Sequence, residues 1–192
     1  MNDFFISDNY QITNKVTGQV VKFLSPDDDA IGLLEMETIY TPFSTEPPVH
    51  YHPYQEEYFQ VLEGELTVRL NGEVKIYREG ASIHIKKHVR HSMWNSGFKT
   101  ALVSWKVMPA MDTAHFLRTM TWLSNNGETN ARGVPALPDM VFLLRKYRKT
   151  FRLDKPPMLV LSILYVLLTP LFFLLHYKRK FNNPTFLKSK KD

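Results

Sequence analysis

Residues 48–64 read PVHYHPYQEEYFQVLEG, and this stretch decides the fold class that the sequence predicts. His50 and His52 are one residue apart, so in an extended chain both imidazoles point to the same face, because side chains alternate with a period of two. Both rings can then reach one metal ion. Taken alone, such a pair near the start of a strand is more often an ordinary surface feature, so the pattern depends on Glu57, on Gly64 and on residues further along the chain.

The complete spacing resembles the two motifs of the cupin superfamily. His-x-His-x4-Glu-x6-Gly matches the first motif, and the second is expected about fifteen residues later. Residues 80–95, GASIHIKKHVRHSMWN, resemble Gly-x5-Pro-x-Gly-x2-His-x3-Asn. Lys86 stands where the family usually has Pro and His88 where it usually has Gly, which leaves the shape of the turn before His91 open.

The resemblance implies a metal site and a fold. Carried over position by position, His50, His52, Glu57 and His91 would be the ligands of one divalent metal ion. Three neutral imidazoles and one carboxylate suit Fe(II), Mn(II), Ni(II), Cu(II) or Zn(II), and they leave positions open for water, dioxygen or substrate. The implied fold class is an all-β core, a double-stranded β-helix (jelly-roll) barrel followed by C-terminal helices.

Several neighbouring residues have less specific interpretations. Glu56 should face away from Glu57 on a strand, and His84 and His88 fall outside the motif positions, so we expect none of the three to bind the metal. Pocket-wall candidates are Phe59, Met93 and Asn95, which share parity with the ligands, with Trp94, Tyr51 and Tyr58 as further aromatics. Val61 shares the same parity, and we expect it in the barrel core.

Short strands with turn signals between them predict the barrel. The clearest hairpin signal is Asn71-Gly72, which supplies the two positive φ angles of a type I′ turn between alternating apolar residues. We expect Leu66, Val68, Leu70, Val74 and Ile76 to line one buried face. The strands are predicted at 20–24, 31–40, 57–62, 65–70, 73–77, 82–86 and 101–108.

The pattern changes after Pro109, where apolar residues at helical spacing predict helices at 114–123 and 136–152. Pro156-Pro157 then suits the start of another helix. The predicted organisation is an N-terminal segment (1–17), the barrel (18–108), a helical extension (109–155), an apolar helix (156–178) and a basic tail (179–192).

Composition limits the possible chemistry. The chain has 192 residues, 44% of them hydrophobic, which suits one domain and an appendage. Because it contains no cysteine, disulfides, thiolate ligands and cysteine nucleophiles are excluded. The first twenty residues do not resemble a secretory signal, so we expect the barrel to be cytoplasmic.

Residues 158–175 are an uncharged apolar run between two basic clusters, and they predict a membrane anchor rather than a nucleic-acid partner. As a helix the run would be about 27 Å long, just short of a hydrocarbon core of about 30 Å. Pro170 leaves open a spanning helix or an interfacial one. The alternative is an apolar helix packed on the barrel or across a dimer.

The predicted function is a metal-dependent enzyme, an oxygenase or isomerase of a small organic molecule, attached to a membrane. Glu57 would act as ligand and as proton acceptor. The alternatives are a non-catalytic metal-bearing module that binds or senses a small molecule, and a scaffold. The resemblance also implies a homodimer through the barrel sheets.

Overall fold

The computed structural model describes residues 10–24 and 32–182. Predictions for residues 1–9, 25–31 and 183–192, among them most of the basic tail, lie outside this range. The described elements are β1 (Gln11–Thr13), β2 (Val20–Phe23), β3 (Leu34–Tyr40), β4 (His50–Tyr51), β5 (Glu56–Glu63), β6 (Glu65–Leu70), β7 (Glu73–Arg78), β8 (Ser82–Ile85), β9 (His91–Trp94), β10 (Ala101–Met108), α1 (Thr113–Asn125), α2 (Leu137–Lys146), β11 (Arg152–Leu153), α3 (Met158–Leu174) and α4 (Tyr177–Asn182).

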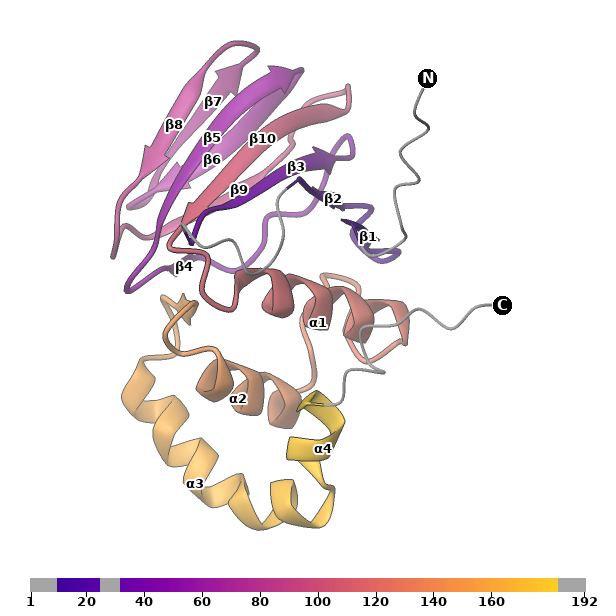
Figure 1. The fold of residues 1–192 in the computed structure, drawn as a ribbon, viewed down its shortest axis with the longest axis vertical. Coiled ribbons are helices and arrows are strands. Elements are labelled where there is room, and N and C mark those ends of the chain that lie inside the picture. Colours follow the sequence, from indigo (N-terminus) through magenta and orange to yellow (C-terminus); the bar gives the residue numbers. More distant parts are fainter. Residues whose placement is uncertain (1–9, 25–31, 183–192) are drawn as a thin grey trace.

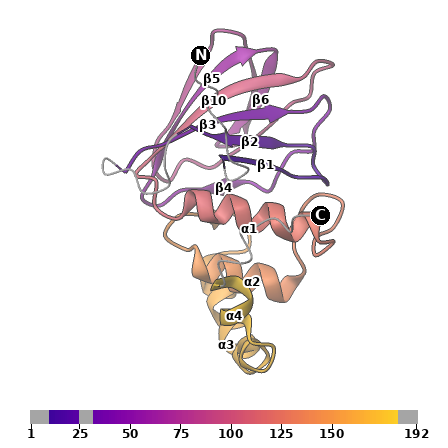
Figure 2. The same cartoon turned by 45° about the vertical axis from the view of Figure 1, so that its right-hand side comes forward.

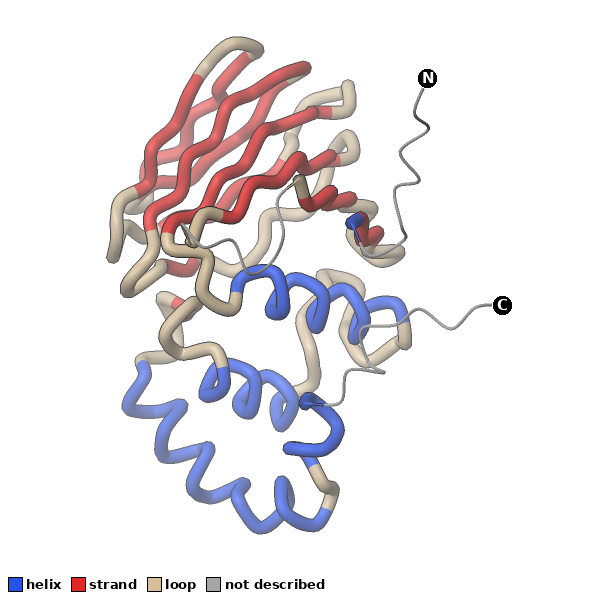
Figure 3. Tube along the Cα trace, viewed as in Figure 1, coloured by secondary structure: helices blue, strands red, loops and turns tan. Residues whose placement is uncertain are grey.

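Two antiparallel sheets face each other and enclose the barrel (Figure 1 and Figure 2). One sheet has the strand order β1-β2-β3-β10-β5-β8, and the other has the order β11-β4-β9-β6-β7. Strands and helices occupy separate parts of the molecule, with α1 beneath the barrel and α2, α3 and α4 beyond it (Figure 3). The predicted fold class, a jelly-roll core followed by C-terminal helices, is confirmed.

Alternation along the strands builds the core of the barrel. In β3 every second side chain from Leu34 to Tyr40 is buried, and in β5 Phe59 and Val61 are 2% and 0% exposed. Each such aliphatic or aromatic side chain contributes about 1.5–3 kcal/mol on burial. The sheets are therefore held together by their inner faces, as expected for Val61.

The hairpin at Asn71-Gly72 forms as predicted. The predicted apolar face, however, is buried only on the strand before the turn and not on the strand after it. Both turn residues have positive φ, 47° and 97°, and Leu70 pairs with Glu73. A two-residue loop pairs residue i with i+3, so the strand after the turn has the opposite parity to the strand before it. Leu66 and Val68 are buried, whereas Val74 and Ile76 lie on the other face of edge strand β7, each 47% exposed.

The second predicted helix ends earlier than expected. The interval 136–152 forms a helix only up to Lys146, because the amides of Thr150 and Phe151 both donate to the carbonyl of Tyr147 and close the end of α2. The chain then runs back to the barrel, where β11 pairs with β4. The helical pattern could not reveal this return, since the pairing partner lies about a hundred residues earlier.

The predicted membrane anchor is wrong. Within residues 10–24 and 32–182, no helix combines the length and the apolar character needed to cross a membrane. Helix α3 has 17 residues, contains Pro170 and packs Leu161 and Phe172 into a cluster with α2. At 1.5 Å per residue it extends about 26 Å, less than a hydrocarbon core of about 30 Å.

Candidate metal site

Three histidines meet at the end of the barrel that faces α1. His50, His52 and His91 each offer a ring nitrogen, and these atoms lie within 4.8 Å of one another. The ring centroids of His50 and His91 are 4.3 Å apart, and that of His52 lies 5.2 Å from His50 and 5.3 Å from His91. Three donors at this separation could hold one metal ion.

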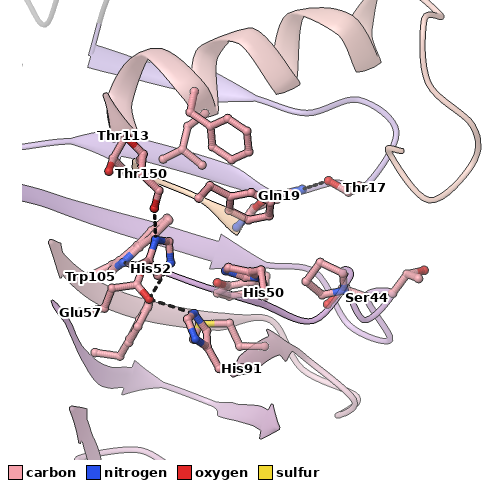
Figure 4. A pocket seen from close by; sticks show the side chains of 18 of the residues that line it. Thr17, Gln19, Ser44, His50, His52, Glu57, His91, Trp105, Thr113 and Thr150 are labelled. Carbon is pink, nitrogen blue, oxygen red and sulfur yellow. Dashed lines mark hydrogen bonds and ion pairs between the residues drawn. The ribbon is translucent and has the colours of Figure 1, made fainter. Parts of the chain in front are cut away.

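Both sheets contribute to the group. His50 in β4 and His91 in β9 are directly paired across adjacent strands, whereas Glu57 comes from β5 in the opposite sheet. Glu57 Oε2 lies 2.9 Å from Nε2 of His91 and 3.2 Å from Nε2 of His52. Figure 4 shows the four side chains directed toward one another. A residue between the two sheets is shielded from water, and Glu57 is only 2% exposed.

Backbone carbonyls orient all three imidazoles in the same way, with Nδ1 of each ring toward a carbonyl oxygen. Nδ1 of His50 lies 3.1 Å from the carbonyl of Pro48, Nδ1 of His91 lies 2.9 Å from that of Val89, and Nδ1 of His52 lies 2.7 Å from that of Thr150. A carbonyl can only accept, so each Nδ1 carries the proton and donates it. In a neutral ring, Nε2 then has a free lone pair, which is the arrangement that metal-binding histidines use.

The buried donor atoms fit a cation. Nε2 of His52 and Oε2 of Glu57 are fully buried, and neither makes a hydrogen bond of good geometry within the described residues, although they are 3.2 Å apart. Two buried lone pairs at this distance need a proton or a metal cation between them. A divalent metal ion satisfies them, and imidazole and carboxylate are suitable donors for one. The histidine group could therefore hold a metal, and the assignment of Glu57 as the fourth ligand stays a prediction.

Charge and burial set the protonation of the group. Burial lowers the pKa of His50 well below its ordinary value, helped by the neighbouring His91 and His52. Burial alone would lower the pKa of His52 as well, but the Glu57 carboxylate outweighs it and raises that pKa. Burial opposes ionisation of Glu57, yet His52 and His91 hold its pKa well below the ordinary value. Glu57 is thus ionised and His50 neutral at neutral pH, as metal binding requires.

A cavity of about 190 Å³ adjoins the four side chains and is lined on another side by residues of α1. Of the predicted wall residues Phe59 and Met93 line it, whereas Asn95 is buried elsewhere. Asn95 instead donates to the backbone carbonyls of Tyr40 and Lys99. The aromatic side chains Trp94, Tyr51 and Tyr58 are also absent from the cavity walls.

Sequence reasoning missed most of the walls. They come from segments outside the two motifs, on both sides of them. Before the motifs the missed residues are Thr17, Gln19, Tyr40, Thr41, Ser44, Thr45 and Pro47; after the motifs they are Trp105, Thr113, Phe116, Leu117, Arg132, Thr150 and Phe151. Trp105 also donates its Nε1–H to Oε1 of Glu57 at 3.1 Å. Another missed contact is that of buried Gln55, whose amide nitrogen lies 2.7–2.9 Å from three oxygens at the start of α1.

The other acidic and imidazole groups near the motifs lie outside the cavity. His84 is exposed, stacks on Tyr58 and lies 2.8 Å from Oε2 of Glu56 on the outer face of the sheet. His88 is exposed and has a φ of 65°, so it keeps the left-handed conformation that glycine adopts most easily at this motif position. Its amide donates to the carbonyl of His52 at 2.9 Å, so the turn leads directly to the site.

The motif glycine at position 64 has a steric role. Its φ is 74°, and a Cβ atom there would lie 2.6 Å from the carbonyl oxygen of Thr100. Only glycine fits the close approach of these two loops without moving backbone. This explains why the first motif ends at Gly64, just before β6 crosses to the other sheet.

Two facing antiparallel sheets with a histidine cluster between them define a jelly-roll barrel with a candidate metal centre. Residues 37–105 match the family model described as "Cupin domain". The chain therefore contains a domain of the cupin superfamily, and the family resemblance drawn from the two motifs is confirmed.

Curated relatives match less than a third of the chain. The tetracenomycin polyketide synthase protein TcmJ of Streptomyces glaucescens is 38% identical over 61 residues, which cover 31% of this chain and 40% of the relative. Polyketide synthase CurC of Streptomyces cyaneus is 38% identical over 60 residues, covering 31% and 39%. An oxidoreductase of Arthrobotrys oligospora is 37% identical over 51 residues, covering 26% and 20%. The chain thus spans less than half the length of each.

Solved structures align with part of the chain. An RmlC-like cupin from Shewanella frigidimarina has a TM-score of 0.47 at 20% identity, covering 59% of this chain and 96% of the other. The cupin domain of an XRE-family transcriptional regulator from Enterobacter cloacae has a TM-score of 0.42 at 21% identity, covering 46% and 94%.

Proposed function

We propose that this protein is a metal-dependent enzyme that acts on a small oxygen-bearing organic molecule, by oxygenation or isomerisation. The observation that carries the proposal is the convergence of unpaired donor atoms from His52 and Glu57, with His50 and His91 beside them, at the floor of a cavity. A purely structural cluster would satisfy its buried donors internally. A metal at an accessible cavity would instead have coordination positions left for a ligand.

The cavity suggests the class of ligand. At about 190 Å³ it is smaller than the pockets of about 300–1,000 Å³ that hold drug-sized molecules. Phe59, Phe116 and Phe151 give it aromatic walls that suit a planar molecule. Arg132 is the only Lys or Arg among the described residues that line the cavity. The loop that carries Arg132 contacts the cavity wall, since the neighbouring Gly133 lies against Thr17, another lining residue. A small aromatic or conjugated ligand with a negative group toward Arg132 matches these walls.

Each part of the site would then have a role. A bound divalent metal would supply Lewis acidity toward a substrate oxygen, and His50, His52, His91 and Glu57 would hold it. Glu57 would also act as the proton acceptor, while Trp105 keeps Oε1 of its carboxylate fixed. The aromatic walls would exclude water, and the charge of Arg132 would orient the substrate.

The relatives are consistent with this proposal. Two are named polyketide synthase proteins and one an oxidoreductase, names that point toward oxygenated organic substrates and redox chemistry. The matched stretches cover only 26–31% of this chain. The reaction itself therefore has to be found by assay.

We expect protein purified without added metal to contain close to one divalent transition metal per chain. We also expect two matched probes, catechol and 3,4-dihydroxybenzoate, to bind to the metal-loaded protein. The same two compounds serve as first substrates in an oxygen-uptake assay. Both probes can chelate the metal, but only the second has a carboxylate for Arg132. The carboxylate should improve the dissociation constant about threefold to tenfold, and Arg132→Gln should remove that difference without changing metal content.

The outcomes separate the alternatives. Metal-free protein that gains no metal on incubation would contradict the proposed function. Metal-loaded protein that binds both probes but turns over no small phenol or keto acid would favour the binding or sensing module. Equal binding of the two probes by the unmodified protein would contradict the proposed anionic ligand but not the proposed metal-dependent function.

A homodimer through the barrel sheets is a further part of the proposal, because paired barrels would cover edge and outer-face residues. We expect light scattering to give twice the 22.5 kDa chain mass at micromolar concentrations. A constant monomer mass up to the highest soluble concentration would exclude it.

A further inference from the structure

The three histidines obtain their backbone partners from very different parts of the chain. His50 and His91 each use the carbonyl two residues before them, so the barrel alone provides those bonds. His52 instead uses the carbonyl of Thr150, 98 residues further along and outside the cupin match at 37–105. At 2.7 Å this is the shortest of the three bonds, and both residues are buried.

A second contact reaches the site from the same segment. The ring of Phe151 stacks on that of His50, with centroids 4.6 Å apart and planes 27° apart. It also meets the ring of His52 edge-on at 6.2 Å. On its other side Phe151 stacks on Phe116 of α1 at 4.8 Å. His50 is therefore held between its own strand and an aromatic ring from the C-terminal extension.

The segment that supplies both contacts, residues 147–154, is here named the strap. At its first end, the hydroxyl of Tyr147 hydrogen-bonds with His115 and lies 3.1 Å from Oγ1 of Thr119. At its other end, β11 pairs with β4, the backbone amide of Asp154 donates to the carbonyl of Val49, and the Asp154 carboxylate forms an ion pair with Arg90. A segment fixed at both ends can hold neighbouring side chains in place.

We propose that the strap is part of the metal centre, with Thr150 and Phe151 as positioning residues for His52 and His50. The inference rests on the proposed metal function and goes beyond it, because it means that the barrel alone does not complete the site. The carbonyl of Thr150 fixes the tautomer of His52 so that Nε2 faces the metal. Phe151 limits the rotation of the His50 ring. Docking of α2 on α1 thereby becomes coupled to metal affinity.

The test uses full-length protein stripped of metal and titrated with Co(II), whose visible spectrum reports coordination geometry. Phe151→Ala is expected to weaken Co(II) binding by about tenfold to a hundredfold, as loss of outer contacts commonly does, and to change the spectrum. Phe151→Leu, which keeps most of the volume, should change the spectrum with less loss of stability. Phe151→Tyr keeps the ring and should bind like the unmodified protein.

The matched control is Phe98→Ala, since Phe98 is an aromatic residue 86% exposed on the barrel surface. It should leave affinity and spectrum unchanged. If the unmodified protein binds Co(II) and both Phe151→Ala and Phe151→Leu bind it with the same affinity and spectrum, the strap has no positioning role and the metal site stands without it. If the unmodified protein binds no Co(II), Zn(II), Fe(II), Mn(II), Ni(II) or Cu(II), the proposed function and this inference both fail.

Discussion

Alanine at His91 is expected to remove most of the bound metal, and alanine at His50 or His52 should do the same. Structural zinc sites bind with about 10–16 kcal/mol, so each of four donors accounts for about 2.5–4 kcal/mol if they share it equally. Loss of one donor then weakens binding on the order of a hundredfold. Elemental analysis of protein purified from cells grown in defined medium measures this directly.

His84 and His88 supply the controls, because each is a histidine close in sequence to His91 but exposed to solvent. Alanine at either position should leave metal content within about twofold of the unmodified protein, since neither ring reaches the cavity. A variant at His84 that loses metal, together with a His91 variant that keeps it, would show that the ligand set is misassigned.

The barrel and the three histidines could be predicted because their signals are local. Alternation, the Asn71-Gly72 turn and the fixed spacing of two motifs each lie within a few residues, and strand pairing then brings His50 directly opposite His91. The error at Val74 and Ile76 is also local. It came from assigning one face to both strands of a hairpin whose two-residue loop reverses the parity.

The part of the site that comes from the chain after the barrel could not be predicted. Its residues reach the site only through contacts with segments that are distant in sequence. Thr150 and Phe151 fall in an interval with helical apolar spacing, and only pairing of β11 with β4 directs them to His52 and His50. Arg132 lies in a loop that carries no motif. The two motifs identify the candidate donor residues, whereas most of the cavity wall comes from residues outside both motifs.

The C-terminal apolar run shows a limit of composition. An uncharged stretch near the length of a membrane span is compatible with a membrane helix and with a helix buried in protein. In the structure, α3 places Leu161 and Phe172 in a cluster with Phe142 of α2. Hydropathy alone does not tell which residues of such a helix pack on a neighbour: Leu161 and Phe172 do so here, whereas Leu167 and Phe173 are 70% and 86% exposed.

Acidification is expected to release the metal beginning at a higher pH than for an ordinary histidine site. A proton and the metal compete for Nε2 of His52, and the Glu57 carboxylate raises the pKa of that ring despite its burial. The competition therefore begins above the ordinary histidine value of about 6.5. Below the raised pKa, one competing proton weakens apparent metal binding about tenfold for each pH unit. Protonation of His50 adds little to this competition near neutral pH, because burial holds the pKa of His50 well below the ordinary value.

Competition titrations with a chelator of known affinity, from about pH 5 to about pH 8, measure the slope. Glu57→Gln is the matched variant, since it preserves shape but removes the charge that raises the pKa of His52. It should bind metal more weakly at about pH 8 and lose affinity more slowly on acidification, because the proton on His52 is then less favoured. Affinity that does not change over this interval in the unmodified protein would mean that His52 does not bind the metal through Nε2.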